Sequence, residues 1–222
     1  MKPTLLITGG ARGIGAAIAE QFQSHGYDVW KPLRTDLDLA NADLLETFIA
    51  RGEGRPVDVL INNAGINVLN SIETLDNAAW QNMLQVNLTS TVRLTQAFLP
   101  GMKERQRGKI LNVSSILSLV AREKRVAYSM TKAALNAFTR SLAVEYGRFG
   151  IIANSLCPGY VDSELTRQNN SAQELEAICN AIPSRRLGQP AEIARIAYFL
   201  CSDENNYING QEIVADGGFV CQ

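Results

Sequence analysis

The sequence predicts an α/β fold, a doubly wound parallel sheet with helices on both faces, and three observations lead to that prediction. Short apolar runs alternate along the chain with longer segments whose apolar residues recur at helical spacing. A glycine-rich loop joins the first apolar run, residues 5–7, directly to a helical segment. The remaining apolar runs are also separated by helical segments, as parallel strands require, and right-handed crossovers then place helices on both faces.

The individual elements follow from the same pattern. Strands are expected at residues 5–7, 27–30, 57–62, 109–113, 151–156 and 212–214. Helices are expected at residues 14–24, 42–50, 77–105, 127–146, 171–181 and 190–200. After the second strand, only residues 31–37 precede Asp38, which is too few for a crossover helix. The connection at this point is therefore expected to be abbreviated or extended.

The composition is typical of one globular domain, expected over residues 1–222, because no Pro/Gly/Ser-rich linker divides the chain. A net charge of −1 gives no electrostatic footprint for nucleic acid. No apolar run is long enough to span a bilayer, and an apolar strand beginning at Leu5 leaves no space for a secretory signal. A cytoplasmic protein without a membrane partner is expected. The 4 cysteines are widely spaced and lack neighbouring histidines, which predicts reduced thiols and no metal site.

The loop after the first strand, Thr8-Gly-Gly-Ala-Arg-Gly-Ile-Gly15, is typical of a phosphate-binding turn. Gly9 permits a tight turn, Gly13 lets the backbone approach a pyrophosphate, and Gly15 allows close packing of the helix on the sheet. The N-terminus of the following helix supplies unpaired N–H donors, so a phosphate can bind there without a lysine. Dinucleotide contacts are therefore expected from Gly9, Arg12, Gly13, Ile14 and Gly15.

A second string, Tyr128-Ser-Met-Thr-Lys132, opens the helical segment at residues 127–146. Residues four apart lie on the same face of a helix, so the Tyr128 phenol and the Lys132 ammonium can face one bound ligand. A free tyrosine ionises near pH ~10, and an adjacent cation favours the phenolate. The spacing therefore predicts that Lys132 lowers the pKa of Tyr128, as proton transfer at neutral pH requires.

These strings resemble those of one enzyme family. The glycine spacing differs from the G-x-G-x-x-G fingerprint, because three residues separate Gly9 from Gly13. Together with Asn62-Asn-Ala-Gly65, the Tyr128 string and Pro158-Gly159, it makes residues 4–219 similar to the short-chain dehydrogenases/reductases. The resemblance implies a Rossmann-type fold and hydride transfer between a nicotinamide and a carbonyl or secondary alcohol carbon, without a metal.

The resemblance also implies four catalytic residues. Tyr128 would donate a proton in reduction and accept one in oxidation, while Lys132 would bond the nicotinamide ribose. Ser115 would hydrogen-bond the carbonyl oxygen, with Ser114 as the alternative. Asn87, inside the helix expected at residues 77–105, would distort that helix and free a backbone carbonyl for a proton-relaying water. A simple surface asparagine is the alternative interpretation of Asn87.

The resemblance extends to further cofactor contacts. Asp38 and Leu39 match the segment that contacts adenine, with Asp36 as the competing register. Ser163 stands where the family often has threonine. Contacts to ribose, pyrophosphate and nicotinamide carboxamide are implied for Asn62, Ala64, Gly65, Pro158, Gly159, Val161 and Ser163.

The choice of cofactor depends on the residues after the second strand. An acidic residue there grips the ribose 2′-hydroxyl of NAD, whereas arginine accommodates the extra phosphate of NADP. This neighbourhood contains Leu33 and Arg34 without an early carboxylate, and Arg12 could approach the same phosphate. Because guanidinium groups bind phosphate oxygens in a bidentate way, NADP(H) is favoured over NAD(H). Solvated arginines are the alternative.

The C-terminal part bears on the substrate. Residues 159–188 are expected to form a substrate lid. The motifs at residues 182–190, 207–211 and 215–219 look most like those of 3-oxoacyl-[acyl-carrier-protein] reductases, which implies an acyl-thioester substrate. A dehydrogenase of a sugar, polyol or other secondary alcohol is the alternative, and a non-catalytic dinucleotide sensor is the third possibility.

Two further features concern contacts with other molecules. The charged run Arg122-Glu-Lys-Arg125 is hypothesised to touch an anionic substrate or carrier, with a solvated loop as the alternative. The helices at residues 77–105 and 127–146 are rich in small and apolar residues, and by resemblance they pair across a two-fold axis. A homotetramer is therefore expected, with a dimer second.

Overall fold

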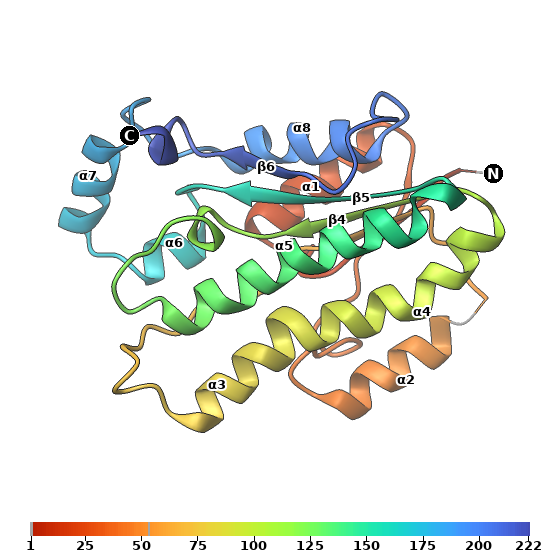
Figure 1. The fold of residues 1–222 in the computed structure, drawn as a ribbon, viewed down its shortest axis with the longest axis horizontal. Helices are drawn as coiled ribbons and strands as arrows, with labels where there is room; N and C mark the ends of the chain where they lie inside the picture. The colour runs from red at the N-terminus through yellow and green to blue at the C-terminus, as the bar shows by residue number, and fades with distance from the viewer. Residues whose placement is uncertain (1, 53) are drawn as a thin grey trace.

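A computed structural model of the protein describes residues 2–52 and 54–222, and it confirms the doubly wound α/β fold (Figure 1). Within the described residues, one parallel sheet has the strand order β2-β1-β3-β4-β5-β6. Its strands are β1 (Thr4–Ile7), β2 (Asp28–Trp30), β3 (Val59–Asn62), β4 (Gly108–Val113), β5 (Ile151–Pro158) and β6 (Glu212–Ala215). Every predicted strand is present.

Helices cover both faces of this sheet. They are α1 (Gly13–Ser24), α2 (Ala42–Gly52), α3 (Asn77–Leu84), α4 (Ser90–Glu104), α5 (Val126–Tyr146), α6 (Glu164–Gln168), α7 (Ala172–Ala181) and α8 (Pro190–Cys201). Figure 1 shows α1 and α8 on one face, and α2, α4 and α5 on the other. Short 3₁₀ turns lie at Ile116–Ser118, Gly147–Phe149 and Phe219–Cys221.

The structure differs from the predicted helices at two places. The helix expected over residues 77–105 is divided into α3 and α4 by a π-helical turn, η1 (Gln85–Thr89). The short helix α6 was not predicted, because its five residues are too few to show a periodic pattern. Its start is fixed locally by Ser163, whose hydroxyl accepts a hydrogen bond from the Thr166 N–H.

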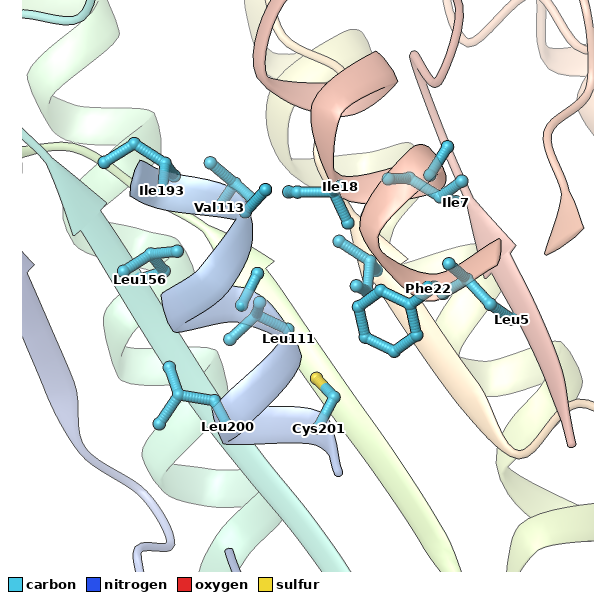
Figure 2. Close-up of a cluster of buried hydrophobic side chains, with 14 of the residues drawn as sticks. Leu5, Ile7, Ile18, Phe22, Leu111, Val113, Leu156, Ile193, Leu200 and Cys201 are labelled. Carbon is cyan, nitrogen blue, oxygen red and sulfur yellow. The ribbon is translucent and has the colours of Figure 1, made fainter. Parts of the chain in front are cut away.

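Apolar side chains hold α1 and α8 on the sheet. Ile18 and Phe22 of α1 and Ile193 of α8 are at most 2% exposed and pack against Leu5 and Leu111 of the strands (Figure 2). Complete burial of a side chain of this size stabilises the fold by about 1.5–3 kcal/mol. The contacts orient α1 so that its N-terminus lies at the carboxyl end of β1.

The strand order creates a crevice. The chain passes from β1 outward to β2 and then returns to β3 on the other side of β1. In open α/β sheets, ligands bind outside the carboxyl ends of the strands at such a reversal. The connection that returns the chain, residues 31–41, contains turns and no helix, as predicted from its length. In this connection the Asn41 side chain caps α2 by accepting from the N–H groups of Asp43 and Leu44.

Candidate active site

A cavity of about 490 Å³ lies at the carboxyl ends of the strands. It is lined by the residues that follow β1, β3 and β4, by the end of β5, and by the first part of α5. The abbreviated connection after β2 closes one end, and residues of the segment that contains α6 line another side. The segments that the sequence analysis singled out therefore meet in one place.

The glycine loop has the backbone geometry that its sequence predicts. Gly9 and Gly13 have φ angles of +66° and +55°, in the left-handed region that favours glycine. A Cβ atom at Gly15 would lie 2.1 Å from the carbonyl oxygen of Gly9, so no side chain fits at Gly15. The N-cap residue Arg12 makes no side-chain capping bond, and Gly13, Ile14 and Gly15 line the cavity. The N-terminal N–H groups of α1 are thus free for an anionic ligand.

A hydrogen-bonded tie joins this loop to the residues after β3. The Thr8 hydroxyl accepts from the N–H groups of Asn63, at 3.1 Å, and Ala64, at 3.0 Å. The Asn63 amide donates to the carbonyl oxygens of Thr8, at 3.0 Å, and Gly9, at 3.2 Å. Thr8 and Asn63 both line the cavity and were missed by the sequence analysis. Asn63 lay within the quoted motif, but the motif alone does not say which asparagine faces the cavity.

Asn62 does not line the cavity, and its expected contact with the cofactor stays a prediction. Asn62 is the last residue of β3 and is 3% exposed. Its amide donates to the side chains of Asn112 in β4, at 2.9 Å, and Thr95 in α4, at 3.4 Å. Asn62 therefore ties the sheet to α4, whereas Ala64 and Gly65 line the cavity as expected.

Asn87 lies in the π-helical turn η1, so the predicted helix distortion is present. The side chain is 1% exposed, which excludes the surface alternative. Its oxygen accepts from the Ile66 N–H at 2.8 Å, and its amide donates to the Ile66 carbonyl at 2.9 Å and to the Thr131 hydroxyl at 3.1 Å. Asn87 does not line the cavity, and its two bonds to Ile66 hold the backbone next to Gly65.

Ser115, Tyr128 and Lys132 line the same part of the cavity. Ser115 follows β4, and its hydroxyl oxygen accepts from the Leu117 N–H at 3.1 Å. The neighbouring Ser114 hydroxyl is buried and donates to the Lys132 carbonyl at 3.1 Å, which anchors α5 to the end of β4. The Lys132 ammonium is 5.6 Å from the centre of the Tyr128 ring and donates to the Val113 carbonyl at 2.7 Å.

Burial dominates the electrostatics of this group, and the expected direction for Tyr128 was wrong. Desolvation raises the pKa of Tyr128 to about 12, and hydrogen bonding to Ser115 opposes that shift without cancelling it. Desolvation also lowers the pKa of Lys132 to about 8. The buried ammonium is costly to charge and is bonded to the Val113 carbonyl, so the phenol does not gain the stabilisation that spacing alone predicts.

The opposite end of the cavity contains the residues expected at the adenosine. Asp38 and Leu39 line it, whereas the competing Asp36 does not. Arg34 also lines it and forms an ion pair with Asp38 at 3.2 Å. Arg12, from the glycine loop, pairs with Glu164 of α6 at 2.5 Å. Both arginine side chains are largely exposed.

The end of β5 completes the lining. Pro158, Gly159, Val161 and Ser163 all lie in it, as expected. A Cβ atom at Gly159 would lie 2.6 Å from the Cβ of Asp216, so the close approach of two chain segments requires glycine. Val161 forms an isolated parallel bridge with Gly188, which fixes the start of the segment that carries α6 and α7.

The arrangement fits a dinucleotide. The unpaired N–H groups at the start of α1 would hold the pyrophosphate, and no protein atom except the Ser163 Cβ, at 3.8 Å, lies near a Cβ built on Gly13. Two further findings concern other ligands and membranes. Over residues 2–52 and 54–222, no group of three or more His, Cys, Asp or Glu side chains could hold a metal ion. Along the same residues, no helix is long and apolar enough to cross a membrane.

Comparisons with known proteins show which enzymes the whole chain is similar to. Residues 32–220 match the family model described as enoyl-(acyl carrier protein) reductase. An acetoacetyl-CoA reductase of Shinella zoogloeoides is 36% identical over 98% of each chain. The FabG 3-oxoacyl-[acyl-carrier-protein] reductase of Vibrio cholerae serotype O1 is 32% identical over 96% of this chain and 95% of its own.

A solved structure extends the likeness to the whole fold. A gluconate 5-dehydrogenase from Burkholderia cenocepacia J2315, in complex with NADP and tartrate, superposes with a TM-score of 0.89 at 29% identity, covering 100% of this chain and 97% of that one. The chain therefore belongs to the short-chain dehydrogenase/reductase family, whose members are NAD(P)-dependent oxidoreductases acting on CH–OH and C=O groups.

Proposed function

We propose that this protein reduces a carbonyl substrate with NADPH, and that Tyr128 is the proton donor. The observation that carries the proposal is that Ser115, Tyr128 and Lys132 line one cavity together with the glycine loop. When bound, the reduced nicotinamide supplies the hydride. A protein that only senses dinucleotide has no need for a phenol and a hydroxyl in that place.

The role of Tyr128 follows from its burial. With a pKa raised to about 12, the phenol is protonated throughout the neutral range, as a general acid must be. In the reductive direction, its O–H donates to the carbonyl oxygen, which gains negative charge as the hydride arrives at the adjacent carbon. The Ser115 hydroxyl donates to the same oxygen, so that two donors hold the substrate and stabilise that charge.

Lys132 and Asn87 act around this pair. The Lys132 ammonium would bind the ribose hydroxyls next to the nicotinamide, and it lies 5.6 Å from the centre of the Tyr128 ring. Asn87 holds the backbone of Ile66, and through it the position of Gly65. A Cβ at Gly65 would lie 3.4 Å from the Lys132 ammonium, so this loop borders the space that the ammonium needs.

The preference for NADP(H) rests on Arg12 and Arg34. Both line the adenosine end of the cavity, and both are paired with a carboxylate. An exposed ion pair contributes only about 0–1 kcal/mol, so a 2′-phosphate can displace either carboxylate at small cost. Asp38 would then accept from the adenine amine, and Leu39 would border the ring.

The first substrate class is a 3-oxoacyl thioester. This choice is supported by two relatives whose names state reduction of acetoacetyl-CoA and of a 3-oxoacyl-[acyl-carrier-protein]. The second class is a hydroxy or oxo acid of the sugar-acid type, which the buried, positively charged Arg125 in the cavity wall favours. In either case residues 159–188, with α6 and α7, form the lid over the substrate.

We also propose a homotetramer that assembles through α4 and α5. Met130 and Val144 on α5 are 52% and 85% exposed, although both are apolar. Along the same helix, the exposed Ala133 and Ala137 leave a surface of small side chains that a second copy could approach closely. Light scattering coupled to size-exclusion chromatography measures the number of copies directly.

The catalytic proposal is tested with Tyr128→Phe, which removes the phenolic proton but retains the ring. NADPH oxidation is followed with a panel of 3-oxo thioesters, oxo acids and ketones, together with NADPH binding by fluorescence. We expect turnover to fall by roughly 10²–10⁴-fold while the dissociation constant of NADPH stays unchanged. Turnover at the wild-type rate in the variant, or no turnover by the wild type on the whole panel, would contradict the proposal.

A further inference from the structure

The wall of the cavity contains a buried cation that the proposed reaction does not use. Arg125 precedes the first turn of α5 and is 6% exposed, yet its side chain lines the cavity. Its one hydrogen bond to another side chain within the described residues is a donation to the Asn67 amide oxygen at 3.5 Å, the longest distance at which such a bond forms. Burial of a guanidinium without a carboxylate is expensive.

The other charged groups of the lining already have partners. Over the described residues the lining contains Arg12 and Glu164, which pair with each other, and Arg34 and Asp38, which do the same. Lys132 donates to the Val113 carbonyl. No carboxylate of the described residues lies within ion-pair distance of Arg125, so no counter-charge neutralises this residue of the cavity wall.

The neighbours of Arg125 strengthen the positive field rather than cancel it. The first turn of α5 has no acidic residue, and the helix N-terminus adds partial positive charge. Nearby, Arg122 donates to the Tyr160 hydroxyl at 3.0 Å and to the Asn170 side chain at 3.4 Å. Glu174 of α7, the acid that acts on the pKa of Arg125, accepts from the Ser171 N–H at 2.7 Å as part of the capping box of its own helix.

The loop that carries Arg125 is held rigidly. Lys124 has a φ angle of +60°, a left-handed conformation that costs energy in a residue with a side chain. The Asn70 N–H donates to the Lys124 carbonyl at 3.1 Å, and Asn70 and Arg125 form a parallel bridge. Both contacts hold this loop against Asn70, which keeps Arg125 in the cavity wall at the start of α5.

We infer that Arg125 is the binding site for a carboxylate on the substrate itself, a few bonds from the carbonyl carbon that accepts the hydride. Arg125 is the N-cap residue of α5, three positions before Tyr128, and its positive charge acts on the Tyr128 phenol. The planar guanidinium matches a carboxylate in a bidentate way. The inference rests on the proposed reductase activity and selects, among its substrate classes, a short oxo acid.

The distance between the ketone and the charged group of the substrate distinguishes a carboxylate-binding site from a site that binds the acyl carrier. In a 3-oxoacyl thioester the group two carbons from the ketone is uncharged, and the nearest charge is on a phosphate at the far end of the pantetheine arm. A guanidinium whose charge acts on the Tyr128 phenol lies too close to the reacting carbon to meet that phosphate. A free carboxylate occupies the corresponding place in acetoacetate.

The experiment compares Arg125→Gln with Lys124→Gln, which removes the same charge from an exposed position in the same loop. Acetoacetate, methyl acetoacetate, acetoacetyl-CoA and the phosphate-free N-acetylcysteamine thioester are each reduced with NADPH. For Arg125→Gln, we expect KM for acetoacetate to rise at least tenfold relative to the wild type, with little change for the uncharged ester. Lys124→Gln should retain wild-type values.

Binding without turnover provides a second measurement. Calorimetric titration of acetoacetate into the NADP⁺-saturated protein should give a dissociation constant that rises at least tenfold in Arg125→Gln. An equal affinity in both proteins, no binding to the wild type, or a loss confined to acetoacetyl-CoA would overturn the inference. If the inference about Arg125 fails but the wild type still reduces the ester and the thioesters in the kinetic experiment, the proposed reductase activity stands.

Discussion

The two ends of the cavity hold their charged groups in opposite ways. At the tyrosine end, formed by Ser115, Tyr128 and Lys132, the lysine is 3% and the serine 9% exposed. At the arginine end, formed by Arg12, Arg34 and Asp38, the side chains of the two arginines are 74% and 84% exposed. The first end is fixed by bonds to the backbone, such as that of Lys132 to Val113, and the second by ion pairs between side chains.

This difference separates two properties of the protein. Burial raises the pKa of Tyr128 to about 12 and lowers that of Lys132 to about 8. At the arginine end, a 2′-phosphate can replace the carboxylate of an exposed ion pair at a cost of about 0–1 kcal/mol. We therefore expect large effects on turnover from changes at the tyrosine end, and small effects on cofactor choice from changes at the arginine end.

After Tyr128→Phe, the largest effect is expected from Lys132→Met, which removes the ammonium but retains a side chain of similar length. Turnover should fall by roughly 100-fold or more, because the variant cannot bond the nicotinamide ribose and the cofactor is no longer held in position. The melting temperature should change little, because a buried ammonium with a pKa lowered to about 8 does not stabilise the folded state. Steady-state kinetics and thermal unfolding measure the two effects.

Lys109→Met is the matched control. Lys109 is also buried, its pKa is also lowered by burial, and it bonds the carbonyl of Asn205, but it does not line the cavity. Turnover should be retained in this variant. An equal loss of turnover in both variants would mean that burial of any lysine in this sheet matters, rather than the position of Lys132.

The sequence predicted the tyrosine end better than the arginine end, because Tyr128 and Lys132 are related by local helix geometry. The glycine loop was predictable for the same reason. The pair Arg12–Glu164 joins residues 152 positions apart, so no local pattern could indicate it. The spacing of Tyr128 and Lys132 could not indicate that burial raises the pKa of Tyr128. The atoms that bury the phenol come from β4, β5 and the loops.

A second expected effect concerns pH. The Lys132 pKa is lowered to about 8, so the ammonium is charged below that pH and loses its proton above it. The Tyr128 pKa is raised to about 12, so the proton donor stays available throughout this window. We expect kcat/KM for reduction to be level below pH 8 and to fall about tenfold per pH unit above it. A plateau that extends to pH 10 would show that Lys132 keeps its proton or is not required.

The smallest effect is expected at the arginine end, from Glu164→Gln. The substitution removes the carboxylate that pairs with Arg12 and leaves the guanidinium free for the 2′-phosphate. NADPH should bind roughly two- to fivefold more tightly, because the Glu164 carboxylate no longer competes with the phosphate for Arg12. NADH binding should stay unchanged. Asp162→Asn is the control, because Asp162 pairs with Arg167 in the same segment and does not line the cavity. An equal change for both cofactors would argue against a contact between Arg12 and the phosphate.

The most direct test of this separation is a fluorescence titration of NADPH and NADH into three proteins: the wild type, Tyr128→Phe and Arg34→Asp. We predict that the wild type and Tyr128→Phe bind NADPH more tightly than NADH, with the same dissociation constants, and that Arg34→Asp loses the preference. A preference for NADH in the wild type, or weaker NADPH binding in Tyr128→Phe than in Arg34→Asp, would contradict the assignment of chemistry to one end of the cavity and cofactor choice to the other.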